Sequence, residues 1–233
     1  MIYVISDLHG YPHEGFLRLL EQARFGEEDF LYILGDVVDR NGDGGVQTLL
    51  WLLGQPNAQL LLGNHEAMLL SCEFVFREIT DETLGSFGAE QLALLNTYLE
   101  NGGGVTLKAL RALSVETRED LFDYLRDAPL YEAVTAGGRD YLLVHAGLGG
   151  FSPEKRLADY TPEELIWASP EPGQAYFADI MTILGHRPTM SFGPEHRGQI
   201  FRTETWMDID VGAGFGQKPV LLRLDDLREF RPE

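Results

Sequence analysis

Six side chains of the kinds that bind metal ions each follow a short apolar run in this sequence. The runs are typical of buried strands and include Ile2–Ile5, Phe30–Leu34 and Tyr141–Val144. The carboxyl ends of strands in an α/β sheet lie along one edge, and ligands gather outside that edge. We therefore expect the six side chains to converge on one metal site. They are Asp7, His9, Asp36, Asn64, His145 and His186.

The composition indicates one ordinary globular domain. The chain has 233 residues, of which 44% are hydrophobic and 24% charged, and we predict a single domain over residues 1–233. No apolar run reaches the roughly 18 residues of a membrane span, and the amino terminus opens directly into a strand. The single cysteine, Cys72, excludes an internal disulfide and favours a reducing compartment. We expect a cytoplasmic protein in which Cys72 is a buried structural thiol.

The chain is strongly acidic, with 18 Lys and Arg against 37 Asp and Glu and a formal net charge of −19. Such a surface repels the phosphate backbone of nucleic acids. We therefore expect neither nucleic acid nor a membrane as a partner. A cation site accounts for part of the acidic excess, and solubility accounts for most of it.

The order of the expected elements indicates an α/β fold. Strands at 2–6, 30–34 and 59–62 alternate with helices near 14–25, 44–54 and 66–79, which predicts a parallel sheet with right-handed crossovers. Residues 81–127 lack a strand pattern and are predicted to form a helical insertion beside the site, interrupted at Asn101–Gly104. Strands dominate from residue 130 onward; they are expected at 130–135, 141–144, 180–184, 199–202, 207–211 and 219–224.

The six donors suit a pair of metal ions. Asp7 and His9 are two residues apart in an extended segment, so both side chains point to the same side. Asp36 offers two oxygens and can bridge two ions. A mixed nitrogen and oxygen set without thiolates suits Mn, Fe, Zn or Mg and excludes a structural zinc cluster. Six donors exceed one tetrahedral site and fit two ions roughly 3.5–4 Å apart.

The motifs resemble those of the calcineurin-like metallophosphoesterases, and within them the bacterial phosphoprotein-phosphatase branch. They are Asp-x-His, Gly-Asp-x-x-Asp-Arg, Gly-Asn-His-Glu, His-Ala-Gly and Gly-His, in this order over residues 7–186. The resemblance implies a β-sandwich flanked by helices, with a dinuclear site at the carboxyl edge of the strands. It also implies that Asp7, His9 and Asp36 hold one metal, and that Asp36, Asn64, His145 and His186 hold the other. Mn²⁺ is the preferred ion, with Fe, Zn, Ni or Mg as alternatives.

Three more residues take catalytic roles from this resemblance. His65 follows the ligand Asn64, so its ring can reach the leaving group and act as a general acid. Asp39 would hydrogen-bond that ring, and Arg40 would bind phosphate oxygens through its planar fork. His13 and His196 match no motif, and we expect both to be exposed.

The sequence departs from the family pattern at two places. Pro188 stands where many members carry a second histidine after Gly-His, which leaves the first metal more open to water. Ser169 lies near the position of a second phosphate-binding arginine in relatives, whereas Arg187 directly follows the ligand His186. Arg187 is therefore a candidate for the missing phosphate contact, and a plain loss of that contact is the alternative.

These features favour a metal-dependent phosphatase that hydrolyses phosphomonoesters with a metal-activated water. Its substrate would be phosphorylated Ser, Thr or Tyr in proteins, or a small phosphorylated metabolite. A dinucleoside tetraphosphate hydrolase is an alternative with the same centre, although the net charge of −19 mildly disfavours so anionic a substrate. A phosphate-binding regulator without catalysis is an alternative of another class, and it would lack a ligand or the acid. A phosphodiesterase or nuclease is weakened by Pro188 and by the acidity.

Overall fold

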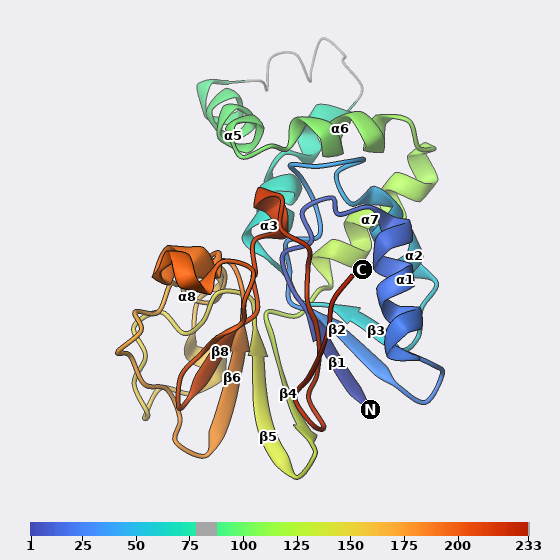
Figure 1. Cartoon of the computed structure of the whole chain (residues 1–233). Coiled ribbons are helices and arrows are strands. Elements are labelled where there is room, and N and C mark those ends of the chain that lie inside the picture. The colour runs from blue at the N-terminus through green and yellow to red at the C-terminus, as the bar shows by residue number, and fades with distance from the viewer. Residues whose placement is uncertain (78–87, 233) are drawn as a thin grey trace.

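Two five-stranded sheets pack face to face in the computed structural model, which describes residues 1–77 and 88–232 (Figure 1). The first sheet has the order β10 (Arg228–Phe230), β9 (Leu221–Arg223), β1 (Ile2–Ile5), β2 (Phe30–Ile33) and β3 (Ala58–Leu60). The second has the order β4 (Tyr131–Ala136), β5 (Arg139–Val144), β6 (Ile180–Leu184), β8 (Trp206–Asp208) and β7 (Phe201–Arg202). The expected β-sandwich is thus confirmed.

Successive side chains along a strand point to opposite faces of its sheet, so each strand contributes both to the core between the sheets and to the core on the outer face. In β1, Val4 points into the core between the two sheets, whereas Tyr3 and Ile5 point to the helices behind the first sheet. In β5, Leu143 joins the same inter-sheet core, and Leu142 packs on the opposite side. The central strands of each sheet are therefore buried on both faces.

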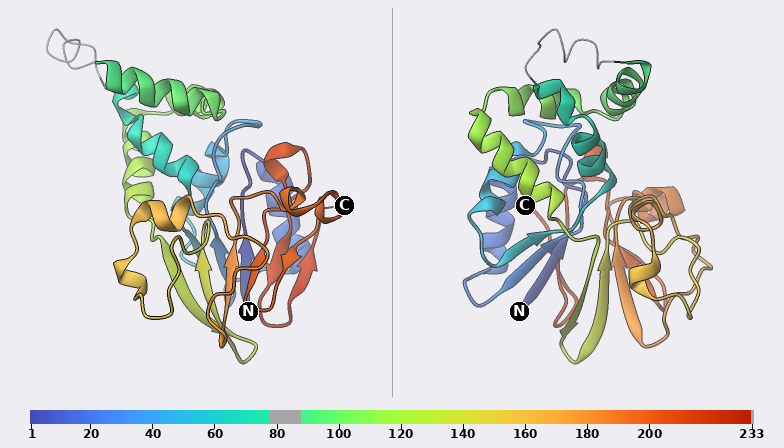
Figure 2. Two further views of the ribbon diagram at one scale, coloured as in Figure 1. Left: turned by 90° about the vertical axis from the view of Figure 1, so that its left-hand side faces the viewer. Right: turned by 180° about the vertical axis from the view of Figure 1, so that it is seen from behind.

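Helices cover the outer faces of both sheets. Behind the first sheet lie α1 (His13–Ala23), α2 (Val46–Leu53) and α7 (Val115–Arg126), and α8 (Pro162–Ile166) lies on the second (Figure 1). Helix α3 (Asn64–Ser71) starts at the strand ends, and α5 (Ala89–Glu100) and α6 (Gly104–Arg111) stand beyond them (Figure 2). The short 3₁₀ helices are η1 (Glu73–Phe76), η2 (Leu157–Asp159), η3 (Thr189–Phe192), η4 (Pro194–His196) and η5 (Ala213–Phe215).

Several sequence expectations change in detail. Strands β1, β2 and β3 pair in parallel, but β9 and β10 pair antiparallel, so the first sheet is mixed. Helix α3 ends at Ser71 rather than near residue 79, and residues 78 and 79 lie outside the described part of the chain. Helix α6 lies within the predicted helical insertion but was not predicted as a separate helix, because the glycines of Asn101–Gly104 hide its beginning. Cys72 is buried at the end of α3, as expected of a structural thiol.

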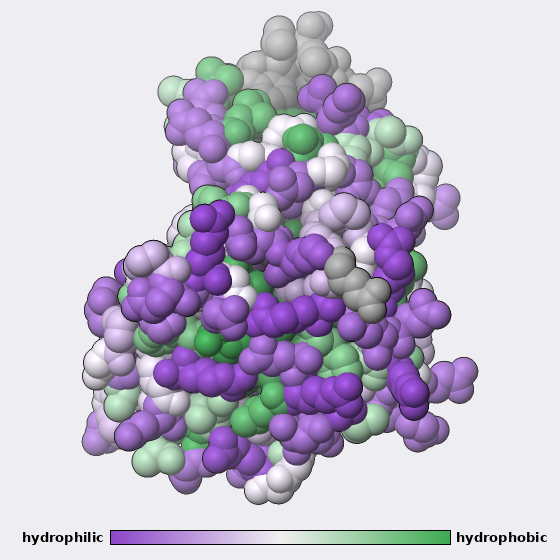
Figure 3. All heavy atoms as spheres, viewed as in Figure 1, coloured by the Kyte–Doolittle hydropathy of each residue, from purple (hydrophilic) through white to green (hydrophobic). Residues whose placement is uncertain are grey.

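The surface seen in one view is mainly hydrophilic. Figure 3 shows one face of the molecule covered mostly by hydrophilic side chains, with smaller hydrophobic areas between them. Within the residues that the structure describes, no helix is long and apolar enough to cross a membrane.

Candidate metal centre

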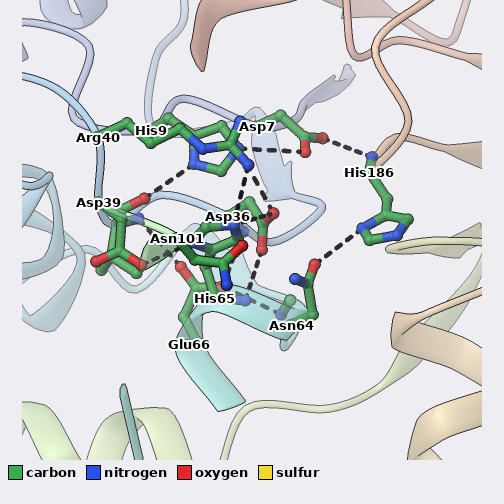
Figure 4. Close-up of polar contacts among 12 residues, drawn as sticks. Asp7, His9, Asp36, Asp39, Arg40, Asn64, His65, Glu66, Asn101 and His186 are labelled. Carbon is green, nitrogen blue, oxygen red and sulfur yellow. Dashed lines mark hydrogen bonds and ion pairs between the residues drawn. The ribbon is translucent and has the colours of Figure 1, made fainter. Parts of the chain in front are cut away.

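The structure brings all six predicted ligands together where the strands end, with contributions from both sheets. Asp7 and His9 follow β1, Asp36 follows β2, and Asn64 begins α3 just after β3. From the second sheet, His145 follows β5 and His186 follows β6. Figure 4 shows the side chains from the first sheet facing His186 across a small central space.

Asp36 lies at the centre of this cluster, and its two oxygens face different neighbours. Oδ2 lies 3.6 Å from Nε2 of His9, which is in turn 3.8 Å from Oδ1 of Asp7. Oδ1 lies 3.5 Å from Nε2 of His145. Oδ1 of Asn64 is 2.9 Å from His145 Nε2 and 2.9 Å from His186 Nδ1. The donors therefore form two groups that share one carboxylate.

The histidines present unprotonated nitrogens to the centre. Nδ1 of His9 donates to the carbonyl of Val38 at 3.1 Å, and Nδ1 of His145 donates to the carbonyl of Leu34 at 2.6 Å, which leaves Nε2 of each ring as the inward lone pair. Burial lowers the pKa of both rings, and burial, followed by the neighbouring His145, His65 and Arg40, lowers the pKa of His186 to about 3. All three rings are neutral at pH 7, the form that binds metals.

The chemistry of the site fits a cation. Oδ1 of Asp7 is fully buried and has no hydrogen-bond partner among the described residues. Burial, and then the charges of Asp7 and Glu66, raise the pKa of Asp36 well above its usual range. Buried carboxylates that face one another are stable as anions only beside positive charge. A divalent ion bound by nitrogen and oxygen donors satisfies this requirement.

His65, Asp39 and Arg40 form a second cluster beside the ligands. Nδ1 of His65 donates to Oδ2 of Asp39 at 2.7 Å, and both side chains are buried. Nη2 of Arg40 lies 3.1 Å from Nε2 of His65, and its guanidinium stacks over the ring of Phe215 at 4.8 Å. Nε2 of His65 also lies 3.9 Å from Oδ2 of Asp36. The ring thus stands between the predicted bridging ligand and the predicted phosphate-binding arginine.

Comparison with known proteins decides the family. The family model described as "Calcineurin-like phosphoesterase" matches residues 1–210, most of the chain. The chain belongs to the calcineurin-like phosphoesterases. It is therefore a hydrolase, and the resemblance drawn from its motifs is confirmed.

Curated relatives of this phosphoesterase include symmetrical bis(5'-nucleosyl)-tetraphosphatases. That of Acidovorax sp. (strain JS42) is 27% identical over 192 residues, which cover 82% of this chain and 54% of the relative. That of Glaesserella parasuis serovar 5 (strain SH0165) is 31% identical over 159 residues, covering 67% and 47%. The chain thus spans about half the length of the curated relatives it matches.

Solved structures share the fold of this phosphoesterase. A protein provisionally assigned as a diadenosine tetraphosphatase aligns with a TM-score of 0.61 at 18% identity, covering 99% of this chain and 91% of that one. A protein serine/threonine phosphatase from Saccharomyces cerevisiae, with similarity to human phosphatase PP5, aligns with a TM-score of 0.56 at 18% identity, covering 94% and 71%. At this identity the likeness establishes the fold alone.

Arg187 of this phosphoesterase lies at the rim of the site, next to Ser169, which was expected to lie near the position of a second phosphate-binding arginine in relatives. Its Nη1 donates to Oγ of Ser169 at 3.2 Å and lies 3.4 Å from a carboxylate oxygen of Glu171. Its Nε donates to Oγ of Ser191 at 2.8 Å, and its guanidinium stacks over Phe192. The two rim positions 169 and 187 are therefore neighbours in space, although an acid also pairs with Arg187.

Two histidines outside the motifs are less exposed than predicted. His13 is half-buried because its Nδ1 lies 3.1 Å from Oγ1 of Thr48 at the start of α1. His196 is half-buried in η4, where its ring packs edge-on against Phe201. The expectation that both are exposed was wrong. Absence of a motif therefore does not indicate that a histidine is exposed to solvent.

Strained backbone at the site was not visible in the sequence. Among the described residues, eight non-glycine residues have positive φ, and six of these belong to the predicted site. Their φ values lie between 44° for His9 and 78° for Asp39. Such conformations cost on the order of 1–3 kcal/mol each for a non-glycine residue. The concentration of strain at one place supports a functional site there. The six are Asp7, His9, Asp36, Asp39, Arg40 and His186.

Two motif glycines allow the ligand loops to approach closely. A Cβ atom added to Gly63 would lie 2.3 Å from Oδ1 of Asp36. A Cβ atom added to Gly185 would lie 2.2 Å from Oδ2 of Asp7. Each glycine therefore leaves space for a carboxylate contributed by another strand, which explains why glycine precedes both Asn64 and His186.

Two further acids were missed among the site's neighbours. Asp208, at the end of β8, and Asp210 are both buried, and burial raises the pKa of each well above its usual range. The charge of Asp7 is the next contribution to the raised pKa of Asp210, so this carboxyl group lies near the first predicted ligand. The sequence signal was an Asp-x-Asp pair at the end of a strand, the same pattern that identified the ligands.

Glu66 was recognised only as part of a motif, yet it organises the loop that carries Asp36. Its carboxylate is fully buried and accepts hydrogen bonds from the backbone N–H groups of Asp36, Val37, Val38 and Gly63, at 2.8 to 3.2 Å. One side chain thus joins the loop after β2 to the start of α3. This contact holds Asp36, the predicted bridging ligand, in place.

We expect Glu66→Ala to lower the free energy of unfolding by at least about 3 kcal/mol, because each buried N–H left unpaired costs roughly 1–3 kcal/mol. Urea unfolding of the metal-stripped protein measures this. The variant Glu163→Ala, at an exposed acid on α8, is the matched control and should lie within about 0.5 kcal/mol of wild type. Equal stability of the two variants would contradict the role given to Glu66.

Proposed function

We propose that the protein is a two-metal hydrolase that breaks a phosphoester or phosphoanhydride bond of a small phosphorylated molecule. The observation that carries this proposal is that the two carboxylate oxygens of Asp36 face different ligand groups. Oδ2 faces His9, and Oδ1 faces His145. Asp7, His9 and Asp36 would hold one ion, and Asp36, Asn64, His145 and His186 would hold the other. We propose Mn²⁺ as the native ion and a cytoplasmic location.

The residues of the second cluster would act on the phosphate. When bound, the ions would activate a water molecule and neutralise charge on the phosphate oxygens. Arg40 would bind two of those oxygens through its planar fork. His65 would donate a proton from Nε2 to the leaving oxygen, while Asp39 holds the ring by its Nδ1–H. This set of roles agrees with the burial of the His65–Asp39 pair.

The contact between Arg40 and His65 suggests how substrate binding prepares the acid. Nη2 of Arg40 lies 3.1 Å from Nε2 of His65. A phosphate that takes Arg40 as its partner would break this contact and leave Nε2 facing the leaving oxygen. Substrate binding would therefore free the nitrogen that is proposed to donate the proton.

The first substrate class we propose is the dinucleoside tetraphosphates. Curated relatives carry this activity in their names. In addition, a groove of about 290 Å³ extends from the ligand Asn64 between α3, α5 and α8, and Met68, Leu94 and Trp167 contribute apolar side chains to it. Trp167 is 49% exposed, and its ring lies 5.9 Å from that of His186. An exposed aromatic ring beside the metal ligands suits an aromatic base on the leaving group.

Phosphoproteins are the second candidate substrate. Pro188 replaces the second histidine after Gly-His, as in the protein-phosphatase branch that the motifs resemble. Turnover of diadenosine tetraphosphate and of a phosphoserine peptide by Mn²⁺-loaded protein separates the two classes. We expect the higher kcat/KM on the tetraphosphate. A higher value on the peptide would reverse the assignment, and no turnover of either substrate or of an aryl phosphate would refute a phosphatase.

We expect Arg187→Ala to lower kcat/KM by roughly tenfold or more without loss of metal. Two charge-assisted hydrogen bonds to phosphate are each worth on the order of 1.5–3 kcal/mol, and 1.4 kcal/mol corresponds to one decade. Adding Ser169→Arg to this variant should recover part of the loss, because positions 169 and 187 are in contact. Steady-state kinetics and inhibition by free phosphate measure both effects.

The control for Arg187 is Arg202→Ala, which removes an arginine paired with Glu229 at 2.8 Å in a surface ion pair. This control should keep wild-type kinetics, since surface pairs contribute little. If Arg187→Ala also keeps wild-type kinetics and unchanged phosphate inhibition, Arg187 has only its contacts within the protein and the second phosphate contact has been lost.

A further inference from the structure

The helical insertion reaches the catalytic cluster through two buried hydroxyl groups. Oη of Tyr98, on α5, donates to Oδ1 of Asp39 at 2.7 Å. Oγ1 of Thr106, on α6, donates to the same oxygen at 2.6 Å and accepts from the backbone N–H of Asp39 at 3.0 Å. Tyr98, Thr106 and Asp39 are all fully buried. The other oxygen of Asp39, Oδ2, accepts from His65.

Close packing fixes both hydroxyls in place. A Cβ atom added to Gly103 would lie 2.5 Å from the ring of Tyr98, and one added to Gly44 would lie 2.3 Å from Oγ1 of Thr106. The glycines therefore let the insertion approach Asp39 more closely than any other residue would. Burial and the charge of Asp39 raise the pKa of Tyr98, so its hydroxyl keeps the proton that it donates.

The same segment also positions the backbone of the neighbouring arginine. The N–H of Arg40 donates to the carbonyl of Gly102 at 3.2 Å. Gly102 has φ of +95°, and a Cβ atom there would lie 3.0 Å from the side chain of Arg40. The glycine turn between α5 and α6 is thus fitted to the loop that carries Asp39 and Arg40, both of which have positive φ.

We propose that Tyr98 and Thr106 are positioning residues, which hold Asp39 so that its free oxygen orients the ring of His65 for proton donation. A carboxylate on a short side chain can rotate, and two donors on Oδ1 stop this rotation. Without them, Oδ2 no longer points steadily at Nδ1 of His65, and misplacement of a catalytic group by about 1 Å can cost up to 10²-fold in rate. This inference rests on the proposed function of His65 as the general acid.

The test uses two aryl phosphates that differ in their leaving group. Phenol is a poor leaving group and needs a proton, whereas 4-nitrophenol needs little. In the Mn²⁺-loaded full chain, Tyr98→Phe with Thr106→Val should lower kcat for phenyl phosphate by roughly tenfold or more. The kcat for 4-nitrophenyl phosphate should fall by less than about threefold, and KM and bound metal should stay at wild-type values. Each single change should give a smaller loss, and Thr106→Ser should restore most of the rate.

A double-mutant cycle with His65→Asn shows whether the hydroxyls act through the imidazole. In that background the Tyr98 and Thr106 changes should have no further effect on either substrate. The matched controls are Tyr141→Phe, whose buried hydroxyl donates to the carbonyl of Leu224, and Thr182→Val, whose buried hydroxyl has no partner among the described residues. Both should keep wild-type kinetics.

The outcomes separate this inference from the function on which it rests. If His65→Asn slows phenyl phosphate selectively but the hydroxyl variants do not, the acid is correct and the positioning role is refuted. If His65→Asn has no selective effect, the proposed acid itself is refuted. Equal losses on both substrates, or loss of metal from the single variants, would show that the two hydroxyls only support the fold.

Discussion

The variant Asp36→Asn should lose both bound metals or keep them without turnover, and its kcat should fall by at least ~10³-fold. A neutral amide cannot supply two anionic oxygens, so both ligand groups lose their shared member. The several kcal/mol of charge stabilisation that two ions supply correspond to a loss of this size, at 1.36 kcal/mol per decade. Metal analysis of the purified variant and kcat at saturating Mn²⁺ measure the two effects.

Removal of metal from the wild-type protein should give the same result reversibly. Chelation should abolish turnover, and Mn²⁺ should restore it and raise the midpoint of thermal unfolding, because an ion that binds only the folded state stabilises it. The matched control for Asp36→Asn is Asp140→Asn, which changes an exposed carboxylate that accepts a hydrogen bond from Thr135 on the neighbouring strand. Full activity with one bound ion or none at saturating Mn²⁺ would contradict a two-metal centre.

His65→Asn should keep both metals and slow turnover by roughly 10²–10⁴, the usual range for a lost general acid. The ring lies between Asp39 at 2.7 Å and Arg40 at 3.1 Å, and it is buried, so water cannot easily replace it as a proton donor. The loss should be largest for phenyl phosphate and should shrink for 4-nitrophenyl phosphate. Single-turnover kinetics on the two substrates measure the difference.

A matched histidine outside the site is the control for this variant. His13→Asn removes a half-buried ring that contacts Oγ1 of Thr48, and it should leave kcat unchanged on both substrates. An equal loss on the two aryl phosphates in His65→Asn would exclude proton donation. The ring would then act only through the arrangement of the ligands, because Nε2 of His65 lies 3.9 Å from Oδ2 of Asp36.

The positions of the candidate ligands could be predicted because they follow from strand ends. Asp7, Asp36, His145 and His186 each come directly after or within a few residues of a strand, and parallel pairing of β1 with β2 and of β5 with β6 places these ends at one edge. That argument needs only the apolar runs and the rule that strands share an edge. Asn64, which follows the apolar run at 59–62, was placed in the same group by the same argument.

The contacts made by the insertion could not be predicted in this way. Thr106 lies 67 residues beyond Asp39 in the chain, and its hydroxyl is one among many with no distinctive pattern around it. The glycines before it were recognised as a break, but their role depends on which side chains they approach. The antiparallel edge formed by β9 and β10 was missed for a similar reason, since pairing direction is set by long-range contacts.

The positive φ angles at the site set stability and catalysis against each other. Six residues there adopt a backbone conformation that glycine and, to a lesser extent, asparagine adopt with less strain. Replacement of Asp39 or Arg40 by glycine would relieve local strain while removing a group proposed for catalysis. Variants chosen for heat resistance alone would therefore tend to erode the centre, so directed evolution of this enzyme has to screen turnover and thermal tolerance together.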